Sequence, residues 1–243
     1  MHLKFFICLI LLSVACSGQR KEKTDFPYVI EEIIYYESFN HADTSAWIIE
    51  AEDEFELTDH VFNGSLDIEV TKGITVWNTT KFKGNLMFEF EVTVVKKGGK
   101  NDRVSDLNCF WMASDPAFPD NFFKRSTWRK GIFWNYYSLN LYYVGYGGHN
   151  NTKTRMRKYN AIAAPVPPVL KEYNDSSHLI IPDKRSVIRI VSFDSIVAYY
   201  FNGEKLFELK EKQPYKEGYF GFRTINNHMK IESFKVCSLS TGD

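Results

Sequence analysis

The chain has 243 residues, of which 44% are hydrophobic and 25% are charged, a composition typical of a packed globular protein. Its 30 basic and 30 acidic residues give a formal net charge of +0. This balance excludes the strong overall attraction for nucleic acid that a basic protein has. Any binding of anions must therefore come from a local patch of basic residues.

The first 15 residues have the features of a secretion signal. Lys4 precedes an apolar run at 5–14 that is too short to span a bilayer, and small residues lead up to Cys16. This ending resembles the lipobox of bacterial lipoproteins, in which cleavage precedes an acylated cysteine; an ordinary secretory signal cleaved nearby is the alternative. We expect a signal peptide at 1–15, a lipid on Cys16, and a polar tether at 16–26. The protein would then belong to the bacterial cell envelope, lipid-anchored in the outer membrane or periplasm, or secreted, with the lipid as its one contact with a membrane.

Residues 27–243 are predicted to form a single all-β domain. Helical periodicity is nearly absent, and short runs rich in β-branched and aromatic residues recur between turn signals. Asn202-Gly203 is the strongest hairpin signal, and 115–130, which holds two prolines, is predicted to be a long loop with room for one helical turn. The predicted strands are 28–38, 55–57, 65–70, 73–78, 86–96, 107–113, 137–146, 154–159, 186–193, 196–201, 204–209, 218–223 and 229–238.

Two cysteines of this domain, Cys109 and Cys237, lie in predicted strands. A disulfide between them and a pair of free core thiols are both compatible with the sequence. The cysteine spacing does not match a metal-binding motif, so no metal site is predicted.

Side-chain alternation along three strands places polar and aromatic residues on one face. If these strands are neighbours, that face forms a groove rather than a core. Tyrosine offers a flat apolar ring with a hydroxyl, which suits a sugar, and arginine binds a carboxylate with two parallel hydrogen bonds. In chain order, the predicted groove residues are Asp106, Asn108, Asn140, Tyr142, Tyr146, Arg155, Arg157 and Tyr159.

Each of these residue types also has a plainer explanation. The cations around Arg155 and Arg157 are typical of a solvated edge strand. The tyrosines could pack in an ordinary core, and His149, in the segment GGHNN, could belong to a turn.

Three segments carry a resemblance to a known family: DLNCFWMASDP at 106–116, LYYVGYGGHNNTKTRMRKY at 141–159 and GYFGFRTINNHMKI at 218–231. From about 39 to 239 the chain resembles secreted bacterial carbohydrate-utilisation proteins of the concanavalin A-like superfamily, related to the YesU-like proteins. The resemblance implies a jelly-roll β-sandwich and a carbohydrate context. It does not identify, residue by residue, a set of catalytic residues in this chain.

The residue types favour a polysaccharide lyase that acts on uronate-containing glycans. Such an enzyme neutralises the uronate carboxylate, removes the proton at C5 and protonates the leaving oxygen, and it needs no metal or organic cofactor. The expected partner is a poly- or oligosaccharide, and not nucleic acid. The catalytic candidates are Tyr142, Tyr146 and His149, and Arg223 and His228 could join the substrate-binding residues from the last hairpin.

Two alternatives stay open. A retaining glycoside hydrolase needs two carboxylates about 5 Å apart. In the predicted groove strands, Asp106 is the only residue with a carboxylate. A non-catalytic carbohydrate-binding protein would use the same surface without a base.

Overall fold

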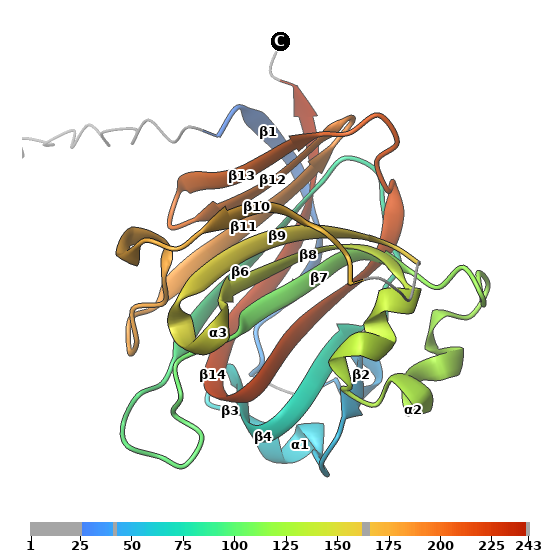
Figure 1. Ribbon diagram of the computed structural model, residues 1–243. Coiled ribbons are helices and arrows are strands. Elements are labelled where there is room, and N and C mark those ends of the chain that lie inside the picture. The colour runs from blue at the N-terminus through green and yellow to red at the C-terminus, as the bar shows by residue number, and fades with distance from the viewer. Residues whose placement is uncertain (1–25, 41–42, 162–165, 242–243) are drawn as a thin grey trace, which may run out of the picture.

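The structure is a computed structural model that describes residues 26–40, 43–161 and 166–241. The predicted signal peptide, Cys16 and all of the tether except Phe26 lie outside these residues. The described strands pair antiparallel and form two layers packed face to face (Figure 1). None of the described helices is long and apolar enough to cross a membrane. The predicted all-β fold class is confirmed.

The layer that we call the front layer contains the predicted groove strands. Its order is β10 (Val169–Tyr173), β9 (Lys153–Asn160), β8 (Asn140–Gly147), β7 (Leu107–Ser114), the first half of β14 (Glu217–Thr241), β4 (Ser65–Asn78), and then β2 (Trp47–Ala51) and β3 (Val61–Phe62). The back layer consists of β1 (Tyr28–Glu37), the second half of β14, β6 (Leu86–Val94), β11 (Ser186–Phe193), β12 (Ile196–Phe201) and β13 (Glu204–Lys210). The two-residue strand β5 (Phe82–Lys83) pairs with the start of β14.

The strand β14 belongs to both layers. Its residues from Tyr219 pair with β7 and β4, whereas its residues after Ile231 pair with β6 and β1. Side chains of its two halves meet in the core between the layers, where the rings of Phe220 and Phe234 stack with centroids 4.6 Å apart. Burial of each such ring stabilises the fold by roughly 1.5–3 kcal/mol.

Local sequence signals are reproduced in the back layer. Asn202 and Gly203 connect β12 to β13 with φ of 50° and 86°, as expected for a two-residue hairpin turn.

The two cysteines of the domain do not form a disulfide. Cys109 and Cys237 are both free and buried, which is the alternative of two free core thiols.

The connection between β7 and β8, residues 115–139, covers part of the outer face of the front layer, and we call it the covering segment. It contains η2 (Phe122–Arg125), α2 (Ser126–Arg129) and η3 (Phe133–Ser138), so the predicted loop at 115–130 is confirmed and extended. In Figure 1 it lies at one end of the sheet beside β2. Beneath it is a second apolar cluster, in which Phe122 and Tyr136 pack on Trp77 and Phe110. The other short helices are η1 (Thr44–Ala46), α1 (Leu57–His60), α3 (Gly148–Asn151) and η4 (Ser176–His178).

Candidate functional site

A pocket of about 550 Å³ opens on the outer face of the front layer, next to the covering segment. This volume falls in the range of small-molecule sites. Four neighbouring strands, β14, β7, β8 and β9, form its floor, and the turn α3 lies at one end. The lining residues are Thr71, Arg103, Asp106, Asn108, Phe133, Tyr143, Gly145, Gly148, His149, Lys153, Arg155, Arg157, Arg223, Ile225 and Asn226.

Strand register explains why these residues meet. Arg223 is paired with Asn108, Asn108 with Gly145, and Gly145 with Arg155. Two residues from Gly145 along β8, Tyr143 is paired with Arg157 on β9, and these two residues form a second row on the same face. Residues paired across strands have Cβ atoms about 5 Å apart on one face. The structure thus brings together six of the predicted site residues: Asp106, Asn108, His149, Arg155, Arg157 and Arg223.

The predicted positions of Tyr142 and Tyr146 were wrong. Both side chains lie in the core between the layers, and their hydroxyls contact backbone groups, Tyr142 accepting from the Tyr215 amide at 3.2 Å and Tyr146 donating to the Leu179 carbonyl at 3.2 Å. Burial raises the pKa of both hydroxyls. The reason is the alternation of side chains along β8. Its odd-numbered residues face the pocket, so its even-numbered residues, which include Tyr142 and Tyr146, face the core.

Three other predicted residues lie away from the pocket. Tyr159 is on the predicted face, but the covering segment buries it, with its ring 5.4 Å from that of Tyr137. Asn140 begins β8 at the far end of the strand, opposite Asn160. His228 is bound between two carboxylates elsewhere on β14.

Tyr143 is the main residue that the sequence analysis missed. Its ring lies over Gly145, since a Cβ added at Gly145 would overlap the Tyr143 hydroxyl. A glycine inside a strand signals such a close approach, and Gly145 was the available clue. Burial raises the pKa of Tyr143, so the hydroxyl is protonated at neutral pH. The other missed lining residues include Thr71, Arg103, Phe133 and Lys153.

The pocket carries a surplus of positive charge. Five cations line it, namely Arg103, Lys153, Arg155, Arg157 and Arg223, and Asp106 is the one carboxylate among the described lining residues. Arg103 pairs with Asp106, while Lys153 and Arg155 share Glu172. Five cations less these two carboxylates leave a net surplus of three positive charges, and Arg157 and Arg223 belong to no ion pair within the described part of the chain.

The floor of the pocket also holds an unpartnered acceptor. Asn108 is 4% exposed, and its Oδ1 has no hydrogen-bond partner among the described residues. A buried polar atom left in this state costs about 1–3 kcal/mol. A ligand that donates a hydrogen bond there would recover this free energy.

Arg223 is fixed in place before any ligand binds. Its Nη1 donates to Thr75 Oγ1 at 3.1 Å and to the Gly131 carbonyl oxygen at 2.8 Å. The rings of Phe133 and Tyr136 each lie with their centroid 5.0 Å from its guanidinium carbon, a favourable arrangement for a cation. Because a ligand would not have to order this side chain, the entropic cost of binding is reduced.

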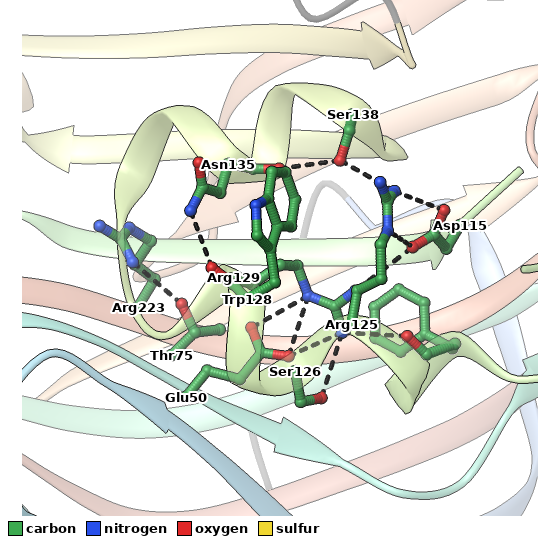
Figure 2. Close-up of polar contacts among 11 residues, drawn as sticks. Glu50, Thr75, Asp115, Arg125, Ser126, Trp128, Arg129, Asn135, Ser138 and Arg223 are labelled. Carbon is green, nitrogen blue, oxygen red and sulfur yellow. Dashed lines mark hydrogen bonds and ion pairs between the residues drawn. The ribbon is translucent and has the colours of Figure 1, made fainter. Parts of the chain in front are cut away.

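A buried ionic network fastens the covering segment to the front layer (Figure 2). Arg129, on α2, donates to Glu50 on β2 through Nε at 2.9 Å, and its Nη1 lies 3.4 Å from Asp115. Arg125 binds Asp115 with two hydrogen bonds of 2.7 and 2.6 Å. Arg129, Glu50 and Asp115 are at most 1% exposed, so each charge depends on the others.

The covering segment then approaches β4 at two glycines. A Cβ added at Gly131 would overlap the carbonyl oxygen of Gly73, and a Cβ at Gly73 would overlap that of Gly131. Gly131 also has a φ of 72°, which favours glycine. This contact presents the Gly131 carbonyl to Arg223 and places Phe133 at the pocket wall.

A separate polar cluster surrounds His228. Its Nε2 lies 2.7 Å from Asp67 Oδ1 and its Nδ1 lies 3.1 Å from Asp102 Oδ1, while Lys230 also contacts Asp67 at 2.9 Å. The hydrogen bond with Asp67 is the largest of the effects that raise the pKa of His228, and the charge of Glu69 adds to it. Burial opposes this rise. Asp102 in turn accepts the backbone N–H groups of the loop before Arg103.

Comparison with known proteins identifies the family. A family model described as "Domain of unknown function (DUF6250)" matches residues 68–234. The chain belongs to the DUF6250 family. A search of curated proteins found no match.

Solved structures share the fold of this DUF6250 chain. A protein of unknown function with a galectin-like fold from Bacillus subtilis has 14% identity and a TM-score of 0.69, over 88% of this chain and 100% of its own. An endo-β-1,3-glucanase from Pyrococcus furiosus has 12% identity and a TM-score of 0.56, over 89% and 99%. Porphyranase B from Zobellia galactanivorans has 9% identity and a TM-score of 0.55, over 86% and 92%. These similarities show the fold alone, and they confirm the predicted concanavalin A-like β-sandwich.

We predict that Arg129→Met lowers the free energy of unfolding of this DUF6250 protein by about 3–5 kcal/mol, because it leaves Glu50 buried without its partner. Glu50→Gln combined with Arg129→Met should lose less than Arg129→Met alone. Arg185→Met is the matched control, since Arg185 is 59% exposed in a surface ion pair and its removal should cost under about 1 kcal/mol. Urea denaturation measures all three; equal losses for Arg129→Met and Arg185→Met would contradict the network's role.

The His228 cluster predicts a pH dependence of stability. A folded-state pKa above the unfolded value of 6.5 means that the contact stabilises fully below pH 6.5 and is lost as pH rises through the folded pKa. Wild type should therefore lose stability above pH 6.5 more steeply than His228→Asn. Urea denaturation at a series of alkaline pH values measures the difference, and parallel pH curves for the two proteins would refute the prediction.

Proposed function

We propose that the pocket binds an acidic sugar unit of a poly- or oligosaccharide. The observation that carries this proposal is the presence, in one pocket, of surplus positive charge and the unpartnered Asn108 Oδ1. A bare anion would satisfy the arginines and leave Asn108 unpaired. A uronate supplies both groups, since its carboxylate can face Arg157 and Arg223 while a hydroxyl donates to Asn108.

The apolar walls and the fold support a sugar. The rings of Phe133 and Tyr143 offer flat surfaces to the apolar faces of a pyranose. Two proteins of the same fold carry the names glucanase and porphyranase, which supports a role connected with carbohydrates. The narrower resemblance to YesU-like proteins stays a prediction.

Hydrolysis by a carboxylate pair is less well supported. Such enzymes need two carboxylates across the scissile bond. Within the described lining of the pocket, Asp106 is the one carboxylate, and it is paired with Arg103.

β-Elimination is the second candidate, favoured by the presence of His149 and Tyr143 in the same pocket. His149 Nε2 lies 2.7 Å from Arg155 Nη1; because arginine only donates, Nε2 accepts this hydrogen bond with its lone pair, and it can act as a base once the substrate carboxylate draws Arg155 away. In the proposed step His149 takes the C5 proton, the electron pair forms the C4–C5 double bond, and the C4–O bond breaks. The protonated Tyr143 gives its proton to the leaving oxygen.

We also propose that the protein is exported and anchored by a lipid on Cys16, as the N-terminal sequence predicts. The Cys16→Ala protein should then leave the detergent phase in a detergent-partition experiment while the wild type remains in it. Equal partition of the two proteins would contradict the anchor.

The sugar proposal is tested by calorimetry with oligomers of galacturonate, mannuronate, guluronate and glucuronate. Arg157→Ala should weaken binding of the preferred uronate by about 10- to 100-fold, since a charge-assisted hydrogen bond contributes about 1.5–3 kcal/mol. The same oligomer with its carboxyls reduced to alcohols should bind weakly to both proteins. Arg185→Ala, outside the pocket, is the control. Absence of binding to every uronate, or unchanged binding by Arg157→Ala, would overturn the proposal.

The same panel distinguishes elimination from binding alone. Elimination creates a conjugated double bond, so ultraviolet absorbance should rise on incubation with the preferred uronate polymer. Tyr143→Phe should then abolish this rise and leave the affinity within a few-fold, because only the hydroxyl is removed. If wild type binds the uronate without any rise in absorbance, the protein is a binding protein and the elimination step is rejected.

A further inference from the structure

We infer that the pocket receives the end of a glycan chain rather than an internal stretch, an inference that rests on the proposed function. An internal stretch needs a groove that is open on two opposite sides. Around Arg223 and Asn108, contacts among the described residues close the pocket on three sides, and the side over β9 is shallow within the described part of the chain.

The first closed side lies toward β4 and β2. At the level of Arg223 the front layer continues to Thr75 on β4 and then to Glu50 on β2. A groove crossing the sheet would run over both strands. Instead, the covering segment lies directly on them: the Gly131 carbonyl accepts from Arg223 Nη1 at 2.8 Å, and a Cβ at Gly131 would be 3.0 Å from the Glu50 carbonyl oxygen. No sugar ring fits beneath such a backbone contact.

The two ends of the pocket along the strands are closed as well. Phe133 stands at one end, and the apolar cluster of the covering segment fills the sheet face beyond it. At the other end the side chain of Arg103 spans the opening. It donates through Nε to the Asn226 carbonyl at 2.9 Å and through Nη1 to Asn150 Oδ1 at 2.6 Å.

Along the paired row from Arg223 to Arg155, burial decreases toward the fourth side. Arg223 and Asn108, on β14 and β7, are 1% and 4% exposed, whereas Arg155 and Arg157, on β9, are partly exposed. The floor from β14 to β9 spans three strand spacings, or about 14 Å. A terminal sugar unit would therefore enter over β9 and reach Arg223, Asn108 and the guanidinium of Arg157, and the next unit would leave over β9 past Arg155.

The stoichiometry of binding tests this inference. Calorimetry is performed with short, medium and long chains of the uronate that wild type prefers in the panel above. If a chain end is recognised, one protein binds per chain at every length, and the affinity per chain stays constant. If internal units are recognised, the number of proteins bound rises in proportion to chain length, and this result would overturn the inference while leaving the proposed function intact.

Modified ends identify which terminus enters. One set of oligomers is reduced to the alditol at the reducing end, and a second carries a neutral sugar on the non-reducing end. One of the two modifications should weaken binding at least about tenfold, and the other should have little effect. Unchanged binding of both sets also refutes chain-end recognition. Absence of binding by every unmodified oligomer would instead reject the proposed function itself.

Discussion

The ion pair between Arg129 and Glu50 is the interaction on which the pocket depends. Two charges removed from water are costly unless they are paired and hydrogen-bonded, and here the pair joins a long connection to the edge of the front layer. The connection consequently lies against β4, where it holds Arg223 through the Gly131 carbonyl. Together with the apolar cluster beneath the covering segment, this attachment gives the outer face of the sheet a second apolar core and a pocket that opens over β9.

The strand β14 connects the pocket to the rest of the molecule. It supplies Arg223 to the pocket, His228 to the carboxylate cluster, and Phe234 to the core between the layers. Because one continuous strand pairs with both layers, the pocket floor cannot move independently of the hydrophobic core. Rigid floors of this kind reduce the entropy lost when a ligand binds.

The sequence predicted the fold class and part of the site for a clear physical reason. Period-two alternation correctly assigned Asn108 on β7 and Arg155 on β9 to one face. On β9 the arginines alternate with the buried Thr154 and Met156, and on β7 Asn108 is the one polar residue before Ser114. It failed on β8, where Tyr142 and Tyr143 are both buried: the covering segment encloses the outer face of this strand, so composition no longer distinguishes its two faces. The attachment of that segment depends on residues 79 positions apart in the chain, Glu50 and Arg129, and no local pattern contains this information.

A shared sandwich does not determine chemistry, since function belongs to the site rather than the fold. This chain shares its β-sandwich fold with the glucanase. The lining of its pocket is cationic, and Asp106 forms an ion pair with Arg103. Positive charge concentrated beside low-dielectric aromatic walls favours a ligand that brings negative charge into the pocket. The unpartnered Asn108 Oδ1 adds the opposite requirement, a donor on the same ligand. The proposed acidic sugar meets both requirements in a single ring.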